Sequence, residues 1–239
     1  MRDAETREHA DRVQKMFARI AGRYDLMNRL MTFGQDQAWR RYVVRLAGVK
    51  SGARLLDIGT GTGSIALEAL QRHPGVEIAA VDFTLNMIQL ARQRKGGDRI
   101  FWLQADGQAL PFKNASFDAV TSGYLIRNVS DPAQTFREQA RVVVPGGKVV
   151  CLDTTPPPDT VLKPLIHLYM KALIPFLGSL VAGDRKAYNY LQESTRAFKT
   201  PEELILIMHE AGLEEVSCRR LMFGTQVVLW GRRPLEKQV

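Results

Sequence analysis

Three acidic residues each follow an apolar segment of the chain, at positions where a carboxylate could bind a nucleoside. Asp57 lies at the end of the first segment, Asp82 ends the second, and Asp106 comes shortly after the third. We expect Asp82 to accept hydrogen bonds from ribose hydroxyls and Asp106 to accept one from an adenine amino group. The carboxylate of Asp57 would repel a pyrophosphate but attract a cationic group. The three acids therefore predict S-adenosylmethionine as the cofactor, because it carries an ammonium and a sulfonium.

A glycine-rich loop directly after Asp57 distinguishes this prediction from other nucleotide sites. Gly59, Gly61 and Gly63 alternate with other residues and, after Ser64, lead into a helix-forming segment, 65–70. Glycine tolerates positive φ and has no Cβ that would keep a ligand away from the backbone. A dinucleotide-binding loop has the spacing G-x-G-x-x-G instead. We therefore expect Asp57, Gly59 and Gly61 to bind the cofactor, and a coincidental glycine turn in another α/β protein is the lesser alternative.

Alternating apolar strands and amphipathic helices must position these residues. The segments predicted as strands are 53–58, 76–81, 100–103, 117–123, 147–153, 215–221 and 225–231. The segments predicted as helices are 7–20, 36–48, 65–70, 84–95, 132–142 and 201–211, with a helical insertion over 159–197 and a tight Pro-Gly-Gly turn at 145–147. Such alternation is typical of a parallel sheet with helices on both faces, so we predict an α/β fold.

The composition is that of an ordinary globular enzyme domain. The 239 residues are 45% hydrophobic and 24% charged, and the first twelve are mostly polar. Because the chain opens on a charged string, we expect no secretory signal, and because no run of 18 apolar residues occurs, we expect no membrane-spanning helix; we predict a cytoplasmic protein. Cys151 and Cys218 fall in predicted strands and are interpreted as small buried side chains. The four histidines lack ligand spacing, so we predict no metal site.

The net charge of +8 leaves three interpretations open: nucleic-acid binding, binding to an anionic membrane surface, or neither. We expect no nucleic acid as a partner. Enzymes that methylate amino groups of bases carry Asp/Asn-Pro-Pro-Tyr/Phe after the fourth strand, where this chain has Thr-Ser-Gly-Tyr at 121–124. Methylation of a pyrimidine carbon would need a nucleophilic cysteine, and neither Cys151 nor Cys218 lies on a suitable predicted loop.

Motifs spread over nearly the whole chain resemble the ubiquinone/menaquinone biosynthesis C-methyltransferases, the family that includes demethylmenaquinone methyltransferases. The most specific ones are Tyr-Asp-Leu-Met-Asn at 24–28 and Arg-Asn-Val at 127–129. The other shared motifs are Gly34, Trp39, Leu110-Pro111-Phe112, Ser116-Phe117-Asp118, Arg141-Val142, Pro145-Gly146-Gly147, Pro175, Gly178-Ser179, Tyr188, Tyr190-Leu191 and Glu193-Ser194. The glycine loop and the Pro-Gly-Gly turn occur in many methyltransferases and carry less weight.

The resemblance implies a fold, a reaction and a set of cofactor contacts. The fold is that of a class I S-adenosylmethionine-dependent methyltransferase, with a Rossmann-like, seven-stranded, mostly parallel sheet whose last strand runs antiparallel. The reaction is C-methylation of a prenylated quinol ring, with demethylmenaquinol favoured and a prenyl-benzoquinol of ubiquinone biosynthesis as the alternative. The cofactor contacts that the resemblance carries over are Thr62, Asp82, Asp106, Gly107 and Ser122.

Three residues are candidates for the catalytic step. A hydroquinone carbon beside a deprotonated hydroxyl is electron-rich, and a guanidinium is suited to stabilise that oxygen. We therefore expect Arg127 to stabilise the oxygen, Asn128 to orient the hydroxyl and Tyr24 to close the ring pocket. The alternatives are an ion pair between Arg127 and a neighbouring acid such as Asp131, a turn or cap role for Asn128, and core packing for Tyr24. No histidine or glutamate is placed as a general base, so we expect the ring proton to leave to water.

Two departures from the family pattern lie where the substrate is expected. Leu-Asp-Thr-Thr at 152–155 replaces Leu-Glu-Phe-Ser, and Tyr-Leu-Ile at 124–126 replaces the usual small or Phe-Gly pair. They leave the acceptor open, so a methyltransferase for another small molecule stays an alternative. A cofactor-binding scaffold without activity is disfavoured by the intact cofactor motif.

We expect one methyltransferase domain in four parts: a helical N-terminal lid over 1–48, a cofactor-binding core over 49–155, a helical insertion or substrate lid over 156–200, and a C-terminal helix with closing strands over 201–239. In the insertion, Lys163, His167 and Lys171 recur at helical spacing on one narrow polar stripe. Such a helix could lie in a membrane interface and admit a prenyl tail, or pack on the domain as a lid. As further partners, we consider the inner face of the membrane, through peripheral contact, and a second copy of the chain, in a homodimer.

Overall fold

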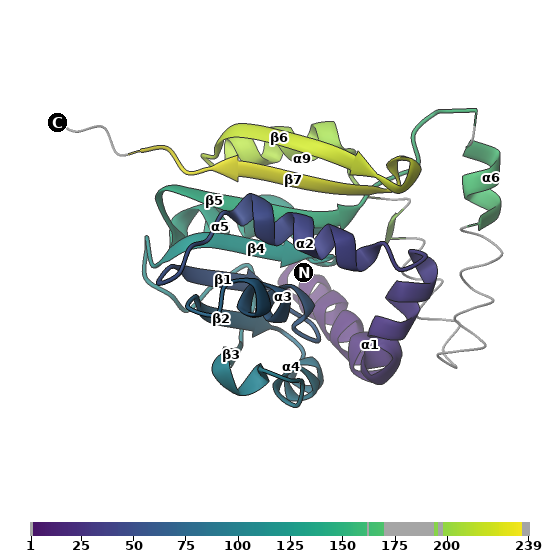
Figure 1. The fold of residues 1–239 in the computed structure, drawn as a ribbon. Coiled ribbons are helices and arrows are strands. Elements are labelled where there is room, and N and C mark those ends of the chain that lie inside the picture. The colour runs from purple at the N-terminus through teal and green to yellow at the C-terminus, as the bar shows by residue number, and fades with distance from the viewer. Residues whose placement is uncertain (1, 162, 170–193, 196–197, 236–239) are drawn as a thin grey trace.

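The computed structural model describes residues 2–161, 163–169, 194–195 and 198–235 (Figure 1). Its centre is a seven-stranded sheet in the order β3-β2-β1-β4-β5-β7-β6. The strands are β1 (Arg54–Ile58), β2 (Glu77–Asp82), β3 (Phe101–Gln104), β4 (Phe117–Gly123), β5 (Val143–Thr154), β6 (Glu214–Leu221) and β7 (Gln226–Arg232). The pairs from β3 through β5 are parallel, whereas β7 runs antiparallel to both β5 and β6. The predicted α/β fold, including its antiparallel last strand, is confirmed.

Helices cover both faces of this sheet. They are α1 (Arg2–Met31), α2 (Asp36–Ala47), α3 (Ser64–Arg72), α4 (Leu85–Arg92), α5 (Pro132–Val142), α6 (Lys163–Leu168) and α9 (Pro201–Glu210), with short 3-10 turns η1 (Gly97–Arg99), η2 (Ile126–Asn128) and η5 (Met222–Gly224). Buried side chains of α2 and α3 pack on one face, and those of α5 and α9 pack on the other. Helix α1 lies beyond the carboxyl ends of the parallel strands and contacts α4 (Figure 1).

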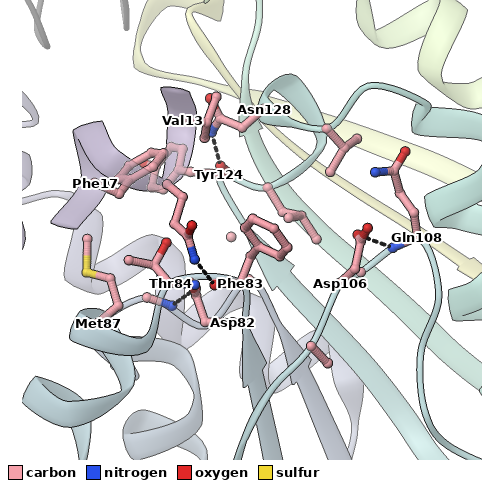
Figure 2. Close-up of a pocket in the computed structure, with 18 of the residues that line it drawn as sticks. Val13, Phe17, Asp82, Phe83, Thr84, Met87, Asp106, Gln108, Tyr124 and Asn128 are labelled. Carbon is pink, nitrogen blue, oxygen red and sulfur yellow. Dashed lines mark hydrogen bonds between the residues drawn. The ribbon is translucent and has the colours of Figure 1, made fainter. Parts of the chain in front are cut away.

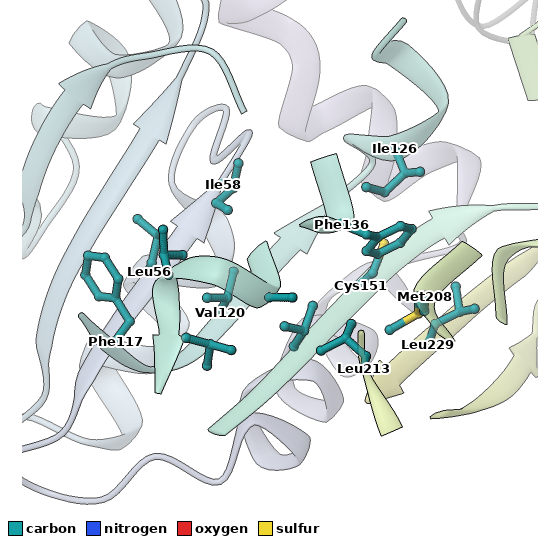
Figure 3. Packing of buried hydrophobic residues seen from close by; sticks show 14 of the residues in the cluster. Leu56, Ile58, Phe117, Val120, Ile126, Phe136, Cys151, Met208, Leu213 and Leu229 are labelled. Carbon is teal, nitrogen blue, oxygen red and sulfur yellow. The ribbon is translucent and has the colours of Figure 1, made fainter. Parts of the chain in front are cut away.

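Alternation along β1 divides its side chains between two cores. Leu55 packs with the α2 and α3 layer, whereas Leu56 and Ile58 pack with Phe136 of α5 (Figure 3). Because successive residues of a strand point to opposite faces, Asp57 shares the face of Leu55. Dense packing of buried aliphatic side chains on both sides holds the ends of the strands in place. This rigid edge is where the predicted site residues gather.

Two of the predicted local structures are wrong. Helix α1 is continuous, so residues 24–28, expected between two helices, form part of its C-terminal portion. No proline or glycine interrupts those five residues, and burial of Met27 favours continuation. The Pro-Gly-Gly segment at 145–147 lies within β5 instead of forming a turn before it. There Gly146 has a φ of +79°, and the register between β4 and β5 shifts nearby.

Much of the predicted insertion lies outside the described residues. This holds for Lys171, for the side chains of Lys163 and His167, and for the family motifs between 175 and 193. The predicted basic stripe therefore stays a prediction. Among the described residues, no helix combines the length and the apolar character needed to cross a bilayer.

Candidate active site

The glycine loop between β1 and α3 is built from three residues with positive φ. Gly59, Gly61 and Gly63 have φ angles of +61°, +56° and +77°. A Cβ on Gly59 would come within 2.8 Å of Leu125 Cδ1, and one on Gly63 within 2.5 Å of the Trp102 ring. A Cβ on Gly61 would meet no atom within 4 Å. Packing therefore excludes side chains at the first and third glycines, while the second leaves open space in which a ligand can lie against the backbone.

Asp57 supports this loop from within the sheet. Its carboxylate accepts hydrogen bonds from Thr60 Oγ1 at 2.6 Å and from Thr121 Oγ1 at 2.8 Å, and the residue is 1% exposed. Burial raises the pKa of Asp57 to about 6, and the two hydroxyl donors offset only part of that shift. A cation bound nearby would favour the ionised form.

A first cavity opens beyond the ends of β2 and β3, and we call it the nucleoside cavity (Figure 2). Asp82 and Phe83 reach it from the end of β2, and Asp106 from the segment after β3. Val13 and Phe17 of α1 close it from the opposite side (Figure 2). It thus combines carboxylate acceptors with apolar and aromatic walls, which suits a nucleoside.

The carboxylate of Asp82 is positioned by the backbone. Oδ2 accepts a hydrogen bond from Gly61 N at 2.7 Å, and Oδ1 accepts one from Thr84 N at 2.8 Å. Burial raises the pKa of Asp82, while these two backbone donors lower it. A carboxylate offers about four acceptor positions, so Asp82 retains capacity for the ribose hydroxyls. Asp106 is oriented similarly, because its Oδ1 accepts from Gln108 N at 2.9 Å.

A second cavity adjoins the first along the glycine loop, and we call it the amino-acid cavity. Both cavities are lined by Tyr24, Tyr124 and the first two loop glycines. Seven of the eight residues predicted to bind the cofactor line one cavity or the other: Asp57, Gly59, Gly61, Thr62, Asp82, Asp106 and Gly107. The eighth, Ser122, is fully buried in β4 and lines neither. The open backbone at Gly61 and the acids around it fit S-adenosylmethionine.

Arg127 lies in η2 and lines neither of the two cavities. Its side chain is 7% exposed, and the guanidinium lies over the Tyr124 ring, 5.2 Å from the centroid. Nη1 donates to Thr154 Oγ1 at 2.9 Å. Nε is 3.9 Å from Asp153 Oδ1, and it makes no hydrogen bond to any described residue.

The alternative of an ion pair between Arg127 and a neighbouring acid is therefore found, but the acid is Asp153 and the expected example, Asp131, is wrong. Asp131 instead caps α5, where its Oδ1 accepts from Gln134 N at 2.8 Å, and it lies 3.8 Å from Arg137. The cap hydrogen bond and the Arg137 contact thus engage the Asp131 carboxylate at the start of α5.

Asp153 is a buried partner of Arg127 that sequence reasoning did not identify in that role, and it lines neither cavity. It is fully buried and accepts hydrogen bonds from the backbone N–H groups of Arg127 and Thr154. Burial raises the pKa of Asp153, while the Arg127 charge lowers it. A signal was present, because Asp153 follows an apolar run near the end of its strand, as Asp82 does.

The other two catalytic candidates lie beside Arg127. Tyr24 lines both cavities and packs edge-on against Phe17, with 5.8 Å between ring centroids. Burial raises the pKa of Tyr24, and the charge of Arg127 lowers it. Asn128 lines the nucleoside cavity, but its Nδ2 donates to Tyr124 O at 2.7 Å, a contact that holds the turn. The catalytic roles of all three residues stay predictions.

Comparisons with known proteins agree with this architecture. The model of the ubiE/COQ5 methyltransferase family matches residues 5–233. The chain is 45% identical over 219 residues to the ubiquinone/menaquinone biosynthesis C-methyltransferase UbiE of Desulfotalea psychrophila, covering 92% of this chain and 89% of that protein. It is 42% identical over 221 residues to the demethylmenaquinone methyltransferase of Thermus thermophilus, covering 92% and 100%.

Solved structures share the fold at lower identity. A SAM-dependent methyltransferase from Thermotoga maritima superposes with a TM-score of 0.65 at 20% identity, covering 92% of this chain and 99% of that one. The fold, the acids at the strand ends and the family match agree on one class of enzyme. The chain belongs to the ubiE/COQ5 methyltransferase family and is an S-adenosylmethionine-dependent methyltransferase.

Proposed function

We propose that this enzyme methylates a ring carbon of a prenylated quinol, converting demethylmenaquinol to menaquinol, with a prenyl-benzoquinol as the alternative acceptor. The names of the Thermus thermophilus and Desulfotalea psychrophila relatives support this acceptor class. The observation that carries the proposal is the buried guanidinium of Arg127, whose Nε has no hydrogen-bond partner among the described residues. A buried donor left without an acceptor costs free energy, and a deprotonated quinol oxygen would supply that acceptor.

The surrounding side chains support a division of tasks in this reaction. S-adenosylmethionine, when bound, supplies an electrophilic methyl group. Arg127 stabilises the ring oxygen, Asn128 orients the hydroxyl, and the rings of Tyr24 and Tyr124 enclose the quinol. The ring carbon gains the methyl group and loses its proton to water. Holding carbon and methyl about 3 Å apart supplies much of the rate by proximity.

The same proposal assigns a task to each part of the single domain. Residues 1–48 act as a lid, since Val13, Phe17 and Tyr24 of α1 line the cavities. Residues 49–155 bind the cofactor, 156–200 cover the acceptor, and 201–239 complete the sheet. Peripheral contact with a membrane surface is part of the proposal, because a prenylated quinol resides in lipid and the net charge of +8 favours an anionic surface.

The test is methyl transfer from labelled S-adenosylmethionine to two reduced, short-prenyl acceptors, a demethylnaphthoquinol and a methoxy-benzoquinol. We expect labelled product from the naphthoquinol. Product from the benzoquinol alone would move the enzyme to the alternative acceptor. Retained binding of S-adenosylhomocysteine with no product from either acceptor would refute the quinol assignment.

A further inference from the structure

One cationic side chain lies among the acids that line the two cavities, and it has a counterpart in the cofactor. S-adenosylmethionine has two cationic groups and a single anionic one, the carboxylate of its methionine part. Of the described residues that line the nucleoside and amino-acid cavities, Arg40 is the only cationic one. It lines the amino-acid cavity together with Asp57, so that cavity offers one acid and one base, the complement of an α-amino acid group.

Arg40 is held rigidly on α2 by its own helix. Its Nη1 lies 3.1 Å from Asp36 Oδ2, and the side chain of Arg40 is only 13% exposed. Asp36 is buried and is itself fixed by Thr32, whose Oγ1 lies 3.3 Å from Asp36 Oδ1 and accepts from Asp36 N at 3.2 Å. The Nη1 edge of the guanidinium is thereby paired with Asp36, and this pairing also fixes the orientation of the Nη2 edge.

That other edge has no hydrogen bond within the part of the chain that the structure describes. Arg40 Nη2 is 4.0 Å from Asp25 Oδ1, beyond hydrogen-bond distance. The carboxylate of Asp25 is engaged elsewhere: it accepts from Thr62 Oγ1 at 2.9 Å, from Ser64 Oγ at 3.3 Å and from Arg94 Nη1 at 3.1 Å. Asp25 therefore lies within ion-pair distance of the outer edge of Arg40 but makes no hydrogen bond to it.

We propose that Arg40 binds the α-carboxylate of S-adenosylmethionine through its Nη2 edge, while the carboxylate of Asp57 attracts the cationic groups of the same ligand. This contact depends on the cofactor and not on the acceptor, so it goes beyond the proposed function. A charge-assisted hydrogen bond is among the stronger polar contacts. Its loss should weaken cofactor binding by about tenfold to about a hundredfold.

Calorimetric binding of two matched ligands tests the proposal. S-adenosylmethionine and decarboxylated S-adenosylmethionine share the adenosine, the sulfonium and the amine, and differ in the carboxylate. We expect Arg40→Met to weaken binding of the first ligand by about tenfold to about a hundredfold, and to change binding of the second by less than about threefold. Arg41→Met is the matched control, because Arg41 is the adjacent residue of α2 and is exposed.

Removing Arg40 also leaves the buried Asp36 without its ion partner, so stability needs its own control. Arg40→Met combined with Asp36→Asn removes both charges, and a thermal midpoint close to that of the wild type would show that it folds. This double variant should show the same selective loss for S-adenosylmethionine, and Arg40→Lys should recover part of it.

Three results would overturn the proposal: unchanged affinity for S-adenosylmethionine, equal weakening of both ligands in the folded double variant, or the same selective loss in Arg41→Met. A protein that shows the selective loss but methylates neither quinol would support the role of Arg40 and refute the proposed function. The two claims therefore fail separately.

Discussion

The two cavities along the glycine loop differ in the charges around them. The nucleoside cavity has Asp82, Asp106 and the ring of Phe83, and its described lining contains no cation. The amino-acid cavity has Arg40, and Arg127 lies over the ring of Tyr124, which both cavities share. One edge of the sheet thus carries two kinds of recognition. In our proposal, hydrogen-bond acceptors serve a neutral nucleoside on one side, and fixed charges serve ionic groups and a developing oxyanion on the other.

The buried acids near this edge show how the division is built. Hydroxyl groups of Thr60 and Thr121 hold Asp57, backbone N–H groups hold Asp82, and Asp153 has both backbone donors and the guanidinium of Arg127. Burial raises the pKa of all three acids. Their different partners, more than their residue type, separate the roles that we assign to them.

The largest expected effect comes from removing the guanidinium at the charged side. Arg127→Leu should lower kcat by about 10²-fold to about 10³-fold, because a preorganised donor to a developing oxyanion is lost. Steady-state kinetics with the reduced quinol would measure this. Binding of S-adenosylhomocysteine should be unchanged. Arg137→Leu is the control, since Arg137 is half-exposed on α5. An equal loss of cofactor affinity in Arg127→Leu would break the division between the two sides.

The next effect is a change in the pH dependence of stability through Asp57. Its pKa rises from 3.8 to about 6 on folding, so the folded protein binds more protons than the unfolded chain between those values. This contribution to the unfolding free energy is present at low pH and is lost as the pH rises through about 6. A gap of about two pKa units corresponds to about 3 kcal/mol.

Urea unfolding of the wild type and Asp57→Asn at pH 7 and pH 4.5 would measure this contribution. On acidification from pH 7 to pH 4.5, we expect the unfolding free energy of the wild type to rise by about 2 kcal/mol more than that of the variant, because folded Asp57 is then largely protonated. Asp98→Asn is the exposed control and should behave as the wild type. Parallel pH profiles for wild type and Asp57→Asn would contradict the assignment.

A smaller effect is expected at the nucleoside side. Asp82→Asn should weaken S-adenosylmethionine, its decarboxylated analogue and adenosine alike, by about tenfold, since one acceptor of the ribose hydroxyls becomes a donor. Titration calorimetry with the three ligands gives the measurement, with Asp98→Asn again as the control. If only the affinity for S-adenosylmethionine fell, Asp82 would act with the amino-acid cavity, which would contradict the division between the two cavities.

The smallest effect tests the partner of Arg127. Asp131→Ala removes the acceptor for Gln134 N and should lower the unfolding free energy by about 1 kcal/mol, the usual value of an N-cap. Because Asp131 does not pair with Arg127, kcat should stay at the wild-type value. Chemical denaturation and steady-state kinetics on the same preparation separate the two readouts. A kcat as low as that of Arg127→Leu would restore the discarded ion pair.

Much of this arrangement could be predicted from local patterns. The strand ending at Gly123 and the helix 132–142 match β4 and α5 residue for residue, since apolar alternation and the Asp-Pro start of the helix are local signals. The continuity of α1 through 24–28 could not be read locally, because it depends on the burial of Met27. Arg40 was missed for the same kind of reason: its helix carries three neighbouring arginines, and spacing does not say which one reaches a cavity.

The fold class, the glycine loop and the acids at the strand ends follow from local patterns, because periodicity, positive φ and the ends of apolar runs are properties of short segments. Tertiary packing is needed to bring Arg127 to Asp153 and to bond Asp25 of α1 to Thr62, residues 37 positions apart. Such contacts depend on how α1 and the strand ends pack together, and a cation or carboxylate selects its partner by distance in space, which no local pattern encodes.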